Sequence, residues 1–486
     1  MGRRGDARLV FLEAIEGNAI AMTTPAGGAT GIPMARALAR AALAVDPGRF
    51  DADVIAKAKL CLLDFLSCVF EARHHPWSQQ AITIARDVPN GATVFGTHAT
   101  ATPGDAAFAN AVMGHGLVRE DMHAASVCHH GVVIWPTLLA LSERTPLSGA
   151  SFLAAAIIGY ETGAQIGRAL ITADLSRLHR PTGLVGPLGT ALAGSFALGL
   201  SEDAATSAIA IAANTSSGLN EWPRAGGSEM YFHPGFAARN AIAAVELAEA
   251  GALASETILE GEAGLFAAFR RQPAPSDIRL FDGPEPEIMA VYNKPAPACN
   301  FAQTAAQAAL RAARELDAAD DIATVSIRVP EAAARYPGCD SMGPFHNALQ
   351  AKMSIPFSVA AVLARGALEE NNYADICDPR ILRLVEQTDL QSDAHLTAAF
   401  PAKQGAEIVA GLRNGKTIRQ RLDNVIAATP DEIRTRFRAA ATAVIGERRA
   451  LNLEQLVDDC AALSDVSVIA AQCGLEPAEQ RLRPAS

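Results

Sequence analysis

The 486-residue sequence has little aromatic content (5%), no cysteines spaced as Cys-x-x-Cys and no excess of positive charge. Its eight cysteines are scattered, which indicates neither a zinc ribbon nor a disulfide framework and makes a reducing compartment the default. A formal net charge of −11 excludes a generally basic nucleic-acid-binding protein. Apolar stretches such as Val132 to Leu141 fall well below the ~18 residues that a membrane span needs. We therefore expect a cytoplasmic protein that binds neither nucleic acid nor a membrane.

Residues 1–33 are expected to form an N-terminal tail. A stretch rich in glycine, threonine and proline, Thr23 to Pro33, separates the start of the chain from the first helical pattern. No apolar segment leading to a cleavage site is present near the start, so a secretory signal is not predicted. The natural start is either Met1 or Met22.

Alanine-rich and leucine-rich segments with helical spacing dominate residues 34–272. Apolar residues recur every three or four positions from Ala52 to Arg73, which predicts a helix with one buried stripe. Thr102-Pro103 before Asp105 supplies a capping oxygen, a proline at the first helical position and a carboxylate in the first turn. A helix should therefore run from there toward His115. Small alanine side chains allow close helix packing, as in an all-helical domain.

A second kind of pattern occupies residues 273–426. Thr324 to Val329 alternates between apolar and polar residues, and Ala406 to Leu412 and Thr417 to Leu422 flank the hairpin-turn signal Asn414-Gly415. Helical segments accompany these strands, so this region is expected to be an α+β lid domain. Helical patterns return in residues 427–486. The predicted fold class is mainly α: a large all-helical domain built from both chain ends, with a smaller inserted α+β lid domain.

Four of the eleven histidines fall within sixteen positions: His115, His123, His129 and His130. Because the imidazole pKa lies near neutrality, such clustering suits proton transfer or metal binding. The spacing matches no standard metal-ligand pattern, so we expect neither a metal ion nor a cofactor. For His123 and His130, a structural role in which the imidazole hydrogen-bonds to loop carbonyls explains their presence as well as a chemical role does. His129, beside Gly131 and a buried-looking run, is the better candidate for chemistry.

Two further clusters carry cations that suit a carboxylate ligand. His179 and Arg180 precede a glycine-punctuated helix start, where backbone donors and a fixed cation can meet an anion. Lys294 follows Tyr292 on a proline-rich turn that leads to Cys299. This lysine can bind a carboxylate or assist proton transfer, and an exposed surface lysine is the equally good alternative.

Eight short motifs occur in a characteristic order along the chain. They are Ala107-Phe-Ala-Asn110 leading to His115, His129 before Gly131 and Pro136, Gly159-Tyr160-Glu161, Pro181-Thr182 leading to Gly186-Pro-Leu-Gly189, His233-x-Gly235-x-Ala237-Ala238, Ile258-Leu-Glu260-Gly261 before Gly264, Lys294-Pro295-x-Pro297, and Gln350-Ala-Lys352-Met-Ser354-Ile-Pro356. Together they resemble the MmgE/PrpD family, over about residues 34 to 470. This family includes 2-methylcitrate dehydratase, cis-aconitate decarboxylase and iminodisuccinate epimerase. The resemblance implies a helical domain made of both chain ends, an α+β lid, an active site in the crevice between them, and a homodimer.

The sequence also departs from the family pattern. Where the family has Asp-(Phe/Tyr)-Asp-Asp-Thr, this chain has Val118-Arg-Glu-Asp-Met122, so the first acidic residue is lost. The family's Thr-Lys-x-Leu-His element lacks its lysine in Glu229 to His233, and the His-Pro pair reads Arg180-Pro181 with His179 displaced by one place. Cys299 stands where the decarboxylase has a histidine. Several acid, base and carboxylate-binding groups of the dehydratase and decarboxylase are therefore missing.

Epimerisation is the family reaction with the smallest chemical requirement. Two proton-transfer groups on opposite faces of one carbon suffice, with cations holding the carboxylates. We therefore expect a cofactor-independent epimerase of a dicarboxylic amino-acid derivative similar to iminodisuccinate. The proton-transfer candidates are His129 with Tyr292 or Cys299, whose unshifted thiol would donate before it could accept. The substrate-binding candidates are His115, His130, His179, Arg180, Lys294 and Lys352.

Other interpretations of the same residues stay open. A dehydratase or hydratase of a 2-methylcitrate-like tricarboxylic acid would use His129 and Asp121. A metal-dependent hydrolase would use the histidine cluster and lose activity on chelation. A non-catalytic protein would bind a carboxylate without turnover.

Overall fold

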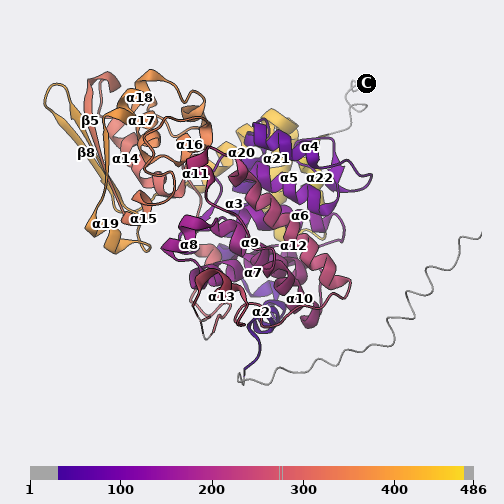
Figure 1. The fold of residues 1–486 in the computed structure, drawn as a ribbon. Helices are drawn as coiled ribbons and strands as arrows, with labels where there is room; N and C mark the ends of the chain where they lie inside the picture. Colours follow the sequence, from indigo (N-terminus) through magenta and orange to yellow (C-terminus); the bar gives the residue numbers. More distant parts are fainter. Residues whose placement is uncertain (1–30, 273, 276, 476–486) are drawn as a thin grey trace, which may run out of the picture. The chain divides into compact units, whose positions relative to one another are not determined.

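A computed structural model describes residues 31–272, 274–275 and 277–475 of the chain. Helices form most of it, and a four-stranded sheet lies in its second half (Figure 1). The predicted fold class is confirmed: the protein is mainly α with a smaller sheet-containing part. Residues 1–30 lie outside the described residues, so the tail of residues 1–33 stays a prediction, as do the boundaries at residues 272 and 426.

The helices of the first half begin where the sequence supplies caps. In α5 (Pro103–His115), the hydroxyl of Thr102 accepts the backbone N–H of Asp105, as the Thr-Pro signal predicts. The predicted helix from Ala52 is α3 (Ala52–Ala72), with Asp51 accepting the N–H of Val54. The other helices of this half are α2 (Met34–Leu43), α4 (Pro76–Ile84), α6 (Gly131–Ser142), α7 (Gly149–Leu170), α8 (Ala173–Leu178), α9 (Pro181–Ala197), α10 (Glu202–Ala213), α11 (Trp222–Ala225), α12 (His233–Glu249) and α13 (Leu265–Arg270).

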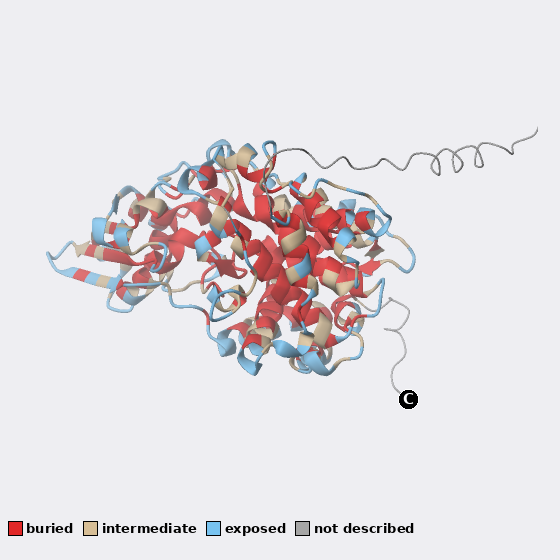
Figure 2. Ribbon diagram, turned by 90° about the horizontal axis from the view of Figure 1, so that it is seen from below, coloured by how far each residue is buried: buried red, intermediate tan, exposed pale blue. Residues whose placement is uncertain are grey.

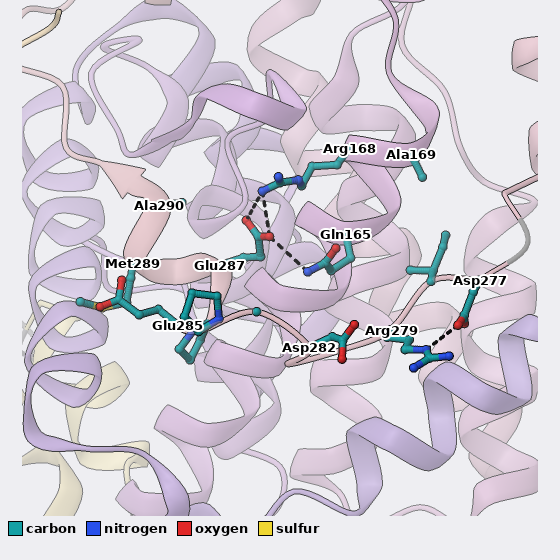
Figure 3. A pocket seen from close by; sticks show the side chains of 14 residues that line it. Gln165, Arg168, Ala169, Asp277, Arg279, Asp282, Glu285, Glu287, Met289 and Ala290 are labelled. Atoms are coloured by element: carbon teal, nitrogen blue, oxygen red, sulfur yellow. Dashed lines mark hydrogen bonds and ion pairs between the residues drawn. The ribbon is translucent and has the colours of Figure 1, made fainter. Parts of the chain in front are cut away.

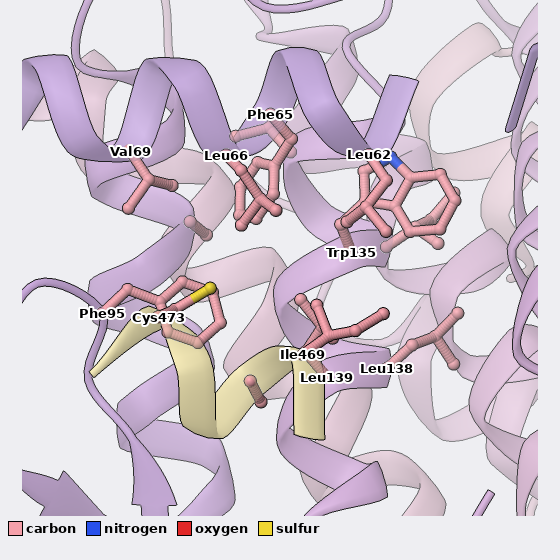
Figure 4. Close-up of a cluster of buried hydrophobic side chains, with 14 of the residues drawn as sticks. Leu62, Phe65, Leu66, Val69, Phe95, Trp135, Leu138, Leu139, Ile469 and Cys473 are labelled. Atoms are coloured by element: carbon pink, nitrogen blue, oxygen red, sulfur yellow. The ribbon is translucent and has the colours of Figure 1, made fainter. Parts of the chain in front are cut away.

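The C-terminal helices pack into the core of the first half. They are α20 (Pro430–Ile445), α21 (Glu447–Asp458) and α22 (Ser467–Cys473). One hydrophobic core contains side chains from residues 54–157 together with Ile433, Phe437 and Ile469. Figure 4 shows α22 contributing Ile469 and Cys473 to the same cluster as Leu62 of α3. Figure 2 shows buried residues gathered inside the helical layers. These contacts support a helical part assembled from both chain ends.

Helices α7 and α9 approach each other through glycines. A Cβ atom at Gly189 of α9 would lie 2.5 Å from the carbonyl oxygen of Gly159 and 2.8 Å from the backbone nitrogen of Gly163, both in α7. No side chain larger than hydrogen fits there without separating the two backbones. This close packing fixes α9, whose N-terminus carries candidate residue Arg180 as its cap.

The sheet has the strand order β6-β5-β7-β8. Strands β5 (Ile322–Val329), β7 (Ala406–Leu412) and β8 (Thr417–Leu422) form where the sequence predicted strands, and Gly415 turns the predicted β7–β8 hairpin with a φ of 84°. The antiparallel pairing of β5 with β7 was not predicted. Strand β6 (Thr388–Ser392), which pairs in parallel with β5, was not predicted. It is a partly exposed edge strand without apolar alternation, so the sequence carries no period-2 signal there.

Helices accompany the sheet and link it to the first half. They are α14 (Gln303–Ala313), α15 (Glu331–Ala334), α16 (Ala348–Met353), α17 (Ile355–Arg365), α18 (Pro379–Glu386) and α19 (Ala394–Ala399). A second hydrophobic core joins α14 and α17 to β5 and β7, and it also includes Trp222 and Tyr231 from the first half. Two short ladders remain: β1 (Ala92–Thr93) pairs with β2 (Thr100–Ala101), and β3 (Met122–His123) pairs with β4 (Val291–Tyr292).

The apolar run from Val132 to Leu141 lies in α6, whose residues are all buried. Within the described residues, no helix combines the length and the apolar character that crossing a membrane requires.

Candidate active site

The β3–β4 ladder brings the histidine-rich segment next to the Lys294 segment. Met122 pairs with Tyr292 and His123 with Val291, so the turns on either side of these pairs face each other. Two valines of the first segment, Val118 and Val127, have left-handed φ angles of 59° and 50°. This conformation is strained for a β-branched residue and is found where function or tight packing demands it.

Glu120 connects His115 and His129. One carboxylate oxygen of Glu120, Oε1, lies 2.6 Å from His115 Nδ1 and 3.0 Å from His129 Nδ1, and all three side chains are buried. Burial opposes ionisation of Glu120, but its contacts with the two imidazoles keep its pKa well below the usual range. Glu120 therefore acts as a shared anionic acceptor that orients both rings.

His129 is held as a neutral imidazole. Its Nδ1 lies 2.8 Å from the carbonyl oxygen of Asp121 as well as near Glu120, so the ring proton sits on Nδ1. Burial lowers the pKa of His129 to about 4, against the opposing effect of Glu120. Its Nε2 is consequently free to accept a proton at neutral pH.

His129 faces a small cavity. The wall consists of five apolar residues, Val118, Met122, Val127, Phe301 and Met353, and five polar ones, His129, Arg180, Cys299, Asn300 and Tyr336. The cavity volume is about 10 Å³, which is roughly the room for one water molecule. Arg180 Nε and the Tyr336 hydroxyl have no hydrogen bond of good geometry among the described residues, although the two side chains interact with each other. Buried polar groups paired this loosely can exchange the contact for one with a ligand.

Cys299 is the second titratable group on the cavity wall. Its Sγ lies 3.6 Å from Cys339 Sγ, and its backbone N–H donates to the carbonyl oxygen of Lys352. Burial opposes the thiolate, but the Cys339 thiol, the Phe301 N–H and the charges of Lys294 and Arg180 lower the pKa of Cys299 to about 7. A thiol of unshifted pKa would mainly donate, whereas Cys299 is poised between donating and accepting near neutral pH.

The three cationic side chains of the region, Arg180, Lys294 and Lys352, differ in whether a carboxylate pairs with them. Arg180 Nη2 donates to His115 Nε2 at 3.2 Å. Lys294 is fully buried and donates to the carbonyl oxygen of Val118, so the alternative of an exposed lysine is wrong. Lys352 is engaged, 2.7 Å from Glu370 and 3.2 Å from the carbonyl oxygen of Leu117. Arg180 and Lys294 remain as the cations nearest the cavity that no carboxylate neutralises directly.

Seven of the ten predicted site residues do not line the cavity: His115, Asp121, His130, His179, Tyr292, Lys294 and Lys352. The Asp121 carboxyl accepts the hydroxyl of Tyr160, and the Tyr292 hydroxyl donates to Asn300. His130 contacts Ser126 and Cys128, and His179 packs its ring edge against Phe269. His123 contacts the hydroxyl and the backbone N–H of Ser126 through Nδ1 and the carboxylate of Glu287 through Nε2, and not the loop carbonyls expected for it.

Sequence reasoning missed three contributors: Glu120 as a histidine partner, and Asn300 and Tyr336 as wall residues. Glu120 had a signal, because it lies among the clustered histidines. Asn300 and Tyr336 had none, because only the folded chain brings them to His129. Among the described residues, no three His, Cys, Asp or Glu side chains are placed to hold one metal ion.

A larger hollow of about 900 Å³ lies elsewhere, lined by residues of α7 and the segment 277–290 (Figure 3). Some of its charged groups pair with one another: Glu287 contacts Arg168 and Gln165, and Asp277 contacts Arg279. Volume alone does not select a catalytic site, and neither a histidine nor a cysteine lines this hollow.

Comparison with known proteins adds independent findings. The profile of the MmgE/PrpD N-terminal domain matches residues 36–277, and that of the MmgE/PrpD C-terminal domain matches residues 296–461. The cis-aconitate decarboxylase-like protein oryM of Aspergillus oryzae is 27% identical over 467 residues, 87% of this chain and 94% of the relative. The cis-aconitate decarboxylase of Aspergillus terreus is 31% identical over 222 residues, 44% of this chain and 45% of the relative. The mitochondrial 2-methylcitrate dehydratase of Yarrowia lipolytica is 26% identical over 375 residues, 71% of this chain and 70% of the relative.

Proposed function

The chain belongs to the MmgE/PrpD family, and from this premise we propose that it is a lyase acting on a small di- or tricarboxylic acid. The relatives named above are a cis-aconitate decarboxylase-like protein, a cis-aconitate decarboxylase and a 2-methylcitrate dehydratase, which favours the dehydratase alternative of the sequence analysis over its epimerase interpretation. One observation carries the proposal: a neutral imidazole and a thiol with a pKa near 7 line the same buried cavity as a fixed cation.

The cavity supplies the groups that both lyase reactions need. For dehydration, His129 Nε2 takes a proton from the carbon next to a carboxylate, and the Cys299 thiol protonates the departing hydroxyl. For decarboxylation, carbon dioxide leaves and the thiol protonates the carbanion that remains. In both reactions Arg180 holds a carboxylate at the cavity wall, and Lys294, which donates to the carbonyl oxygen of the wall residue Val118, adds positive charge beside the negative charge that develops.

Epimerisation is the second candidate. The observation that favours it is the presence of two proton-transfer groups, His129 and Cys299, on one cavity wall. A dicarboxylate bound between them would lose its α-proton to one group and regain a proton from the other.

Proton NMR in D₂O distinguishes these reactions in one format. The enzyme is mixed separately with cis-aconitate, 2-methylcitrate and iminodisuccinate stereoisomers, before and after chelator treatment. We expect loss of carbon dioxide or water from a tricarboxylate, with deuterium at the protonated carbon after decarboxylation. Deuterium entry into iminodisuccinate with stereoisomer interconversion, and no lyase product, would instead establish the epimerase. Loss of activity on chelation would point to the metal-dependent alternative.

The pH dependence of kcat/KM is a second test. Below about pH 4, His129 is protonated and cannot act as a base; above about pH 7, Cys299 is ionised and cannot donate. We therefore expect kcat/KM to be highest between these values and to fall on both sides. Cys299→Ser should remove the fall on the alkaline side, because a serine hydroxyl does not ionise in this range. An unchanged alkaline limb in this variant would assign that limb to another group.

A further inference from the structure

The catalytic cavity is too small for a substrate. Its polar wall residues His129, Arg180, Cys299 and Tyr336 are only 2–5% exposed, and its volume of about 10 Å³ is that of a single water. A di- or tricarboxylic acid is many times larger than one water molecule. Some part of the wall must therefore move before substrate can reach His129.

A groove of about 410 Å³ lies directly outside this wall. It runs between the segment Ala124–Val127 and α8 on one side and α15 with the segment 397–401 on the other. Three side chains, those of Val127, Phe301 and Tyr336, line both the groove and the cavity. The two spaces are thus separated by a single layer of side chains.

That layer has the features of a movable partition. Val127 adopts its left-handed conformation here, and strained residues of this kind cluster at ligand clamps and switch regions. The ring of Phe301 stands 5.1 Å from that of Tyr336 and 5.9 Å from that of Phe400, centroid to centroid. Rotation of aromatic side chains about χ1 and χ2 opens a passage without unfolding an element.

We propose that this groove is the entrance site through which a small carboxylate reaches the cavity, with Val127, Phe301 and Tyr336 as the gate. The ligand class rests on the proposed lyase function, whereas the position of the entrance rests on the shared wall alone. The charged groups of the groove are Arg177, Arg335, Asp174 and Glu331. Arg335 is paired with Glu331 at 2.8 Å, while Arg177 makes no ion pair among the described residues. Arg177 is therefore the group that attracts an incoming carboxylate.

Alkylation of Cys299 tests the entrance without requiring turnover. Iodoacetate is a small carboxylate: the Cys299 thiolate attacks its methylene carbon, a sulfur–carbon bond forms, and iodide leaves. The rate at Cys299 is followed by peptide mass spectrometry. Cys377, the exposed cysteine of the described residues, serves as an internal standard in every sample.

Filling the groove should slow this reaction. We expect Ala173→Trp and Ala125→Trp, which place an indole in the groove from α8 and from the neighbouring segment, to lower the Cys299 rate at least about tenfold relative to Cys377, about 1.4 kcal/mol in activation free energy. Ala439→Trp is the matched control, because Ala439 is exposed on α20, away from the groove. Equal alkylation rates at Cys299 in all three variants and the wild type would overturn the proposal that this groove is the entrance.

Charge substitutions test the ligand class. Arg177→Gln should lower the ratio of iodoacetate to iodoacetamide rates at Cys299, and Asp174→Asn should raise it, each about twofold to threefold at low salt. An unchanged ratio in both variants would reject carboxylate attraction by the groove. Alkylation needs no substrate turnover, so the two proposals can fail separately. If the NMR experiment shows no lyase activity but the tryptophan variants slow alkylation of Cys299 as expected, the proposed function is rejected and the proposed entrance is retained.

Discussion

Replacing His129 with asparagine is expected to lower turnover by about 10²–10⁴-fold, the usual contribution of a positioned acid or base. The side-chain amide of asparagine can still donate to the carbonyl oxygen of Asp121, as His129 Nδ1 does at 2.8 Å. Only the Nε2 position at the cavity is lost, so the fold should be retained. Steady-state kinetics with the substrate identified by NMR, together with circular dichroism, measures both effects.

His123→Asn is the matched control for this prediction. His123 belongs to the same segment and is buried, but it contacts Ser126 and Glu287 and does not line the cavity. Its replacement should reduce stability and leave kcat within a few-fold of the wild type. If His129→Asn keeps full turnover, or if both variants lose it equally, His129 is not the base.

Gly189→Ala is expected to destabilise the protein by about 1–3 kcal/mol, the usual cost of overpacking a rigid core. In an unpacked helix this substitution would stabilise, because alanine is the better helix former by up to about 1 kcal/mol. Here the added methyl group would meet the backbone of α7 at Gly159 and Gly163, which cannot rotate away as a side chain can. The midpoint of urea unfolding, followed by helical circular dichroism, measures the change.

Gly104→Ala provides the comparison, because it makes the same chemical change in α5. The nearest atom to a Cβ there is Arg239 Cγ at 3.4 Å, an ordinary contact with a flexible side chain. We expect an unchanged or higher midpoint for Gly104→Ala and a lower one for Gly189→Ala. Equal midpoints would mean that α7 and α9 can separate at little cost.

The secondary-structure elements that form as predicted are those with a local sequence signal: a helix cap, a turn or an alternating pattern. The Thr102-Pro103 cap, the Asn414-Gly415 turn and the alternating segment from Thr324 each act over a few residues, and α5, the β7–β8 hairpin and β5 form as expected. Strand β6 had no such signal, because an exposed edge strand forms only when β5 offers its free edge. Its existence depends on tertiary pairing.

The candidate site likewise has features that the local sequence predicts and features that only the fold creates. His129 and Cys299 were identifiable from residue type and from family motifs. The acidity of Cys299 was not, because it arises from Cys339, Lys294 and Arg180, which the fold gathers from distant segments. The loss of the family's first acidic residue suggested that some of the family's acid and base residues are missing. Glu120, which contacts both His115 and His129, shows that a carboxylate still serves the histidines from a neighbouring position.

The assembly of the helical core from both chain ends has a consequence during synthesis. Asp64 of α3 lies 3.4 Å from Arg436 of α20, a guanidinium that leaves the ribosome 372 residues later. At about 5–20 residues per second, the wait is about 20–70 s. Through that time the apolar stripe of α3 lacks the α20 surface that finally covers it, whereas β5 to β8 are synthesised within one hundred residues of each other. Nascent chains from which β8 has left the ribosome and α20 has not should therefore hold a paired sheet and an incomplete helical core.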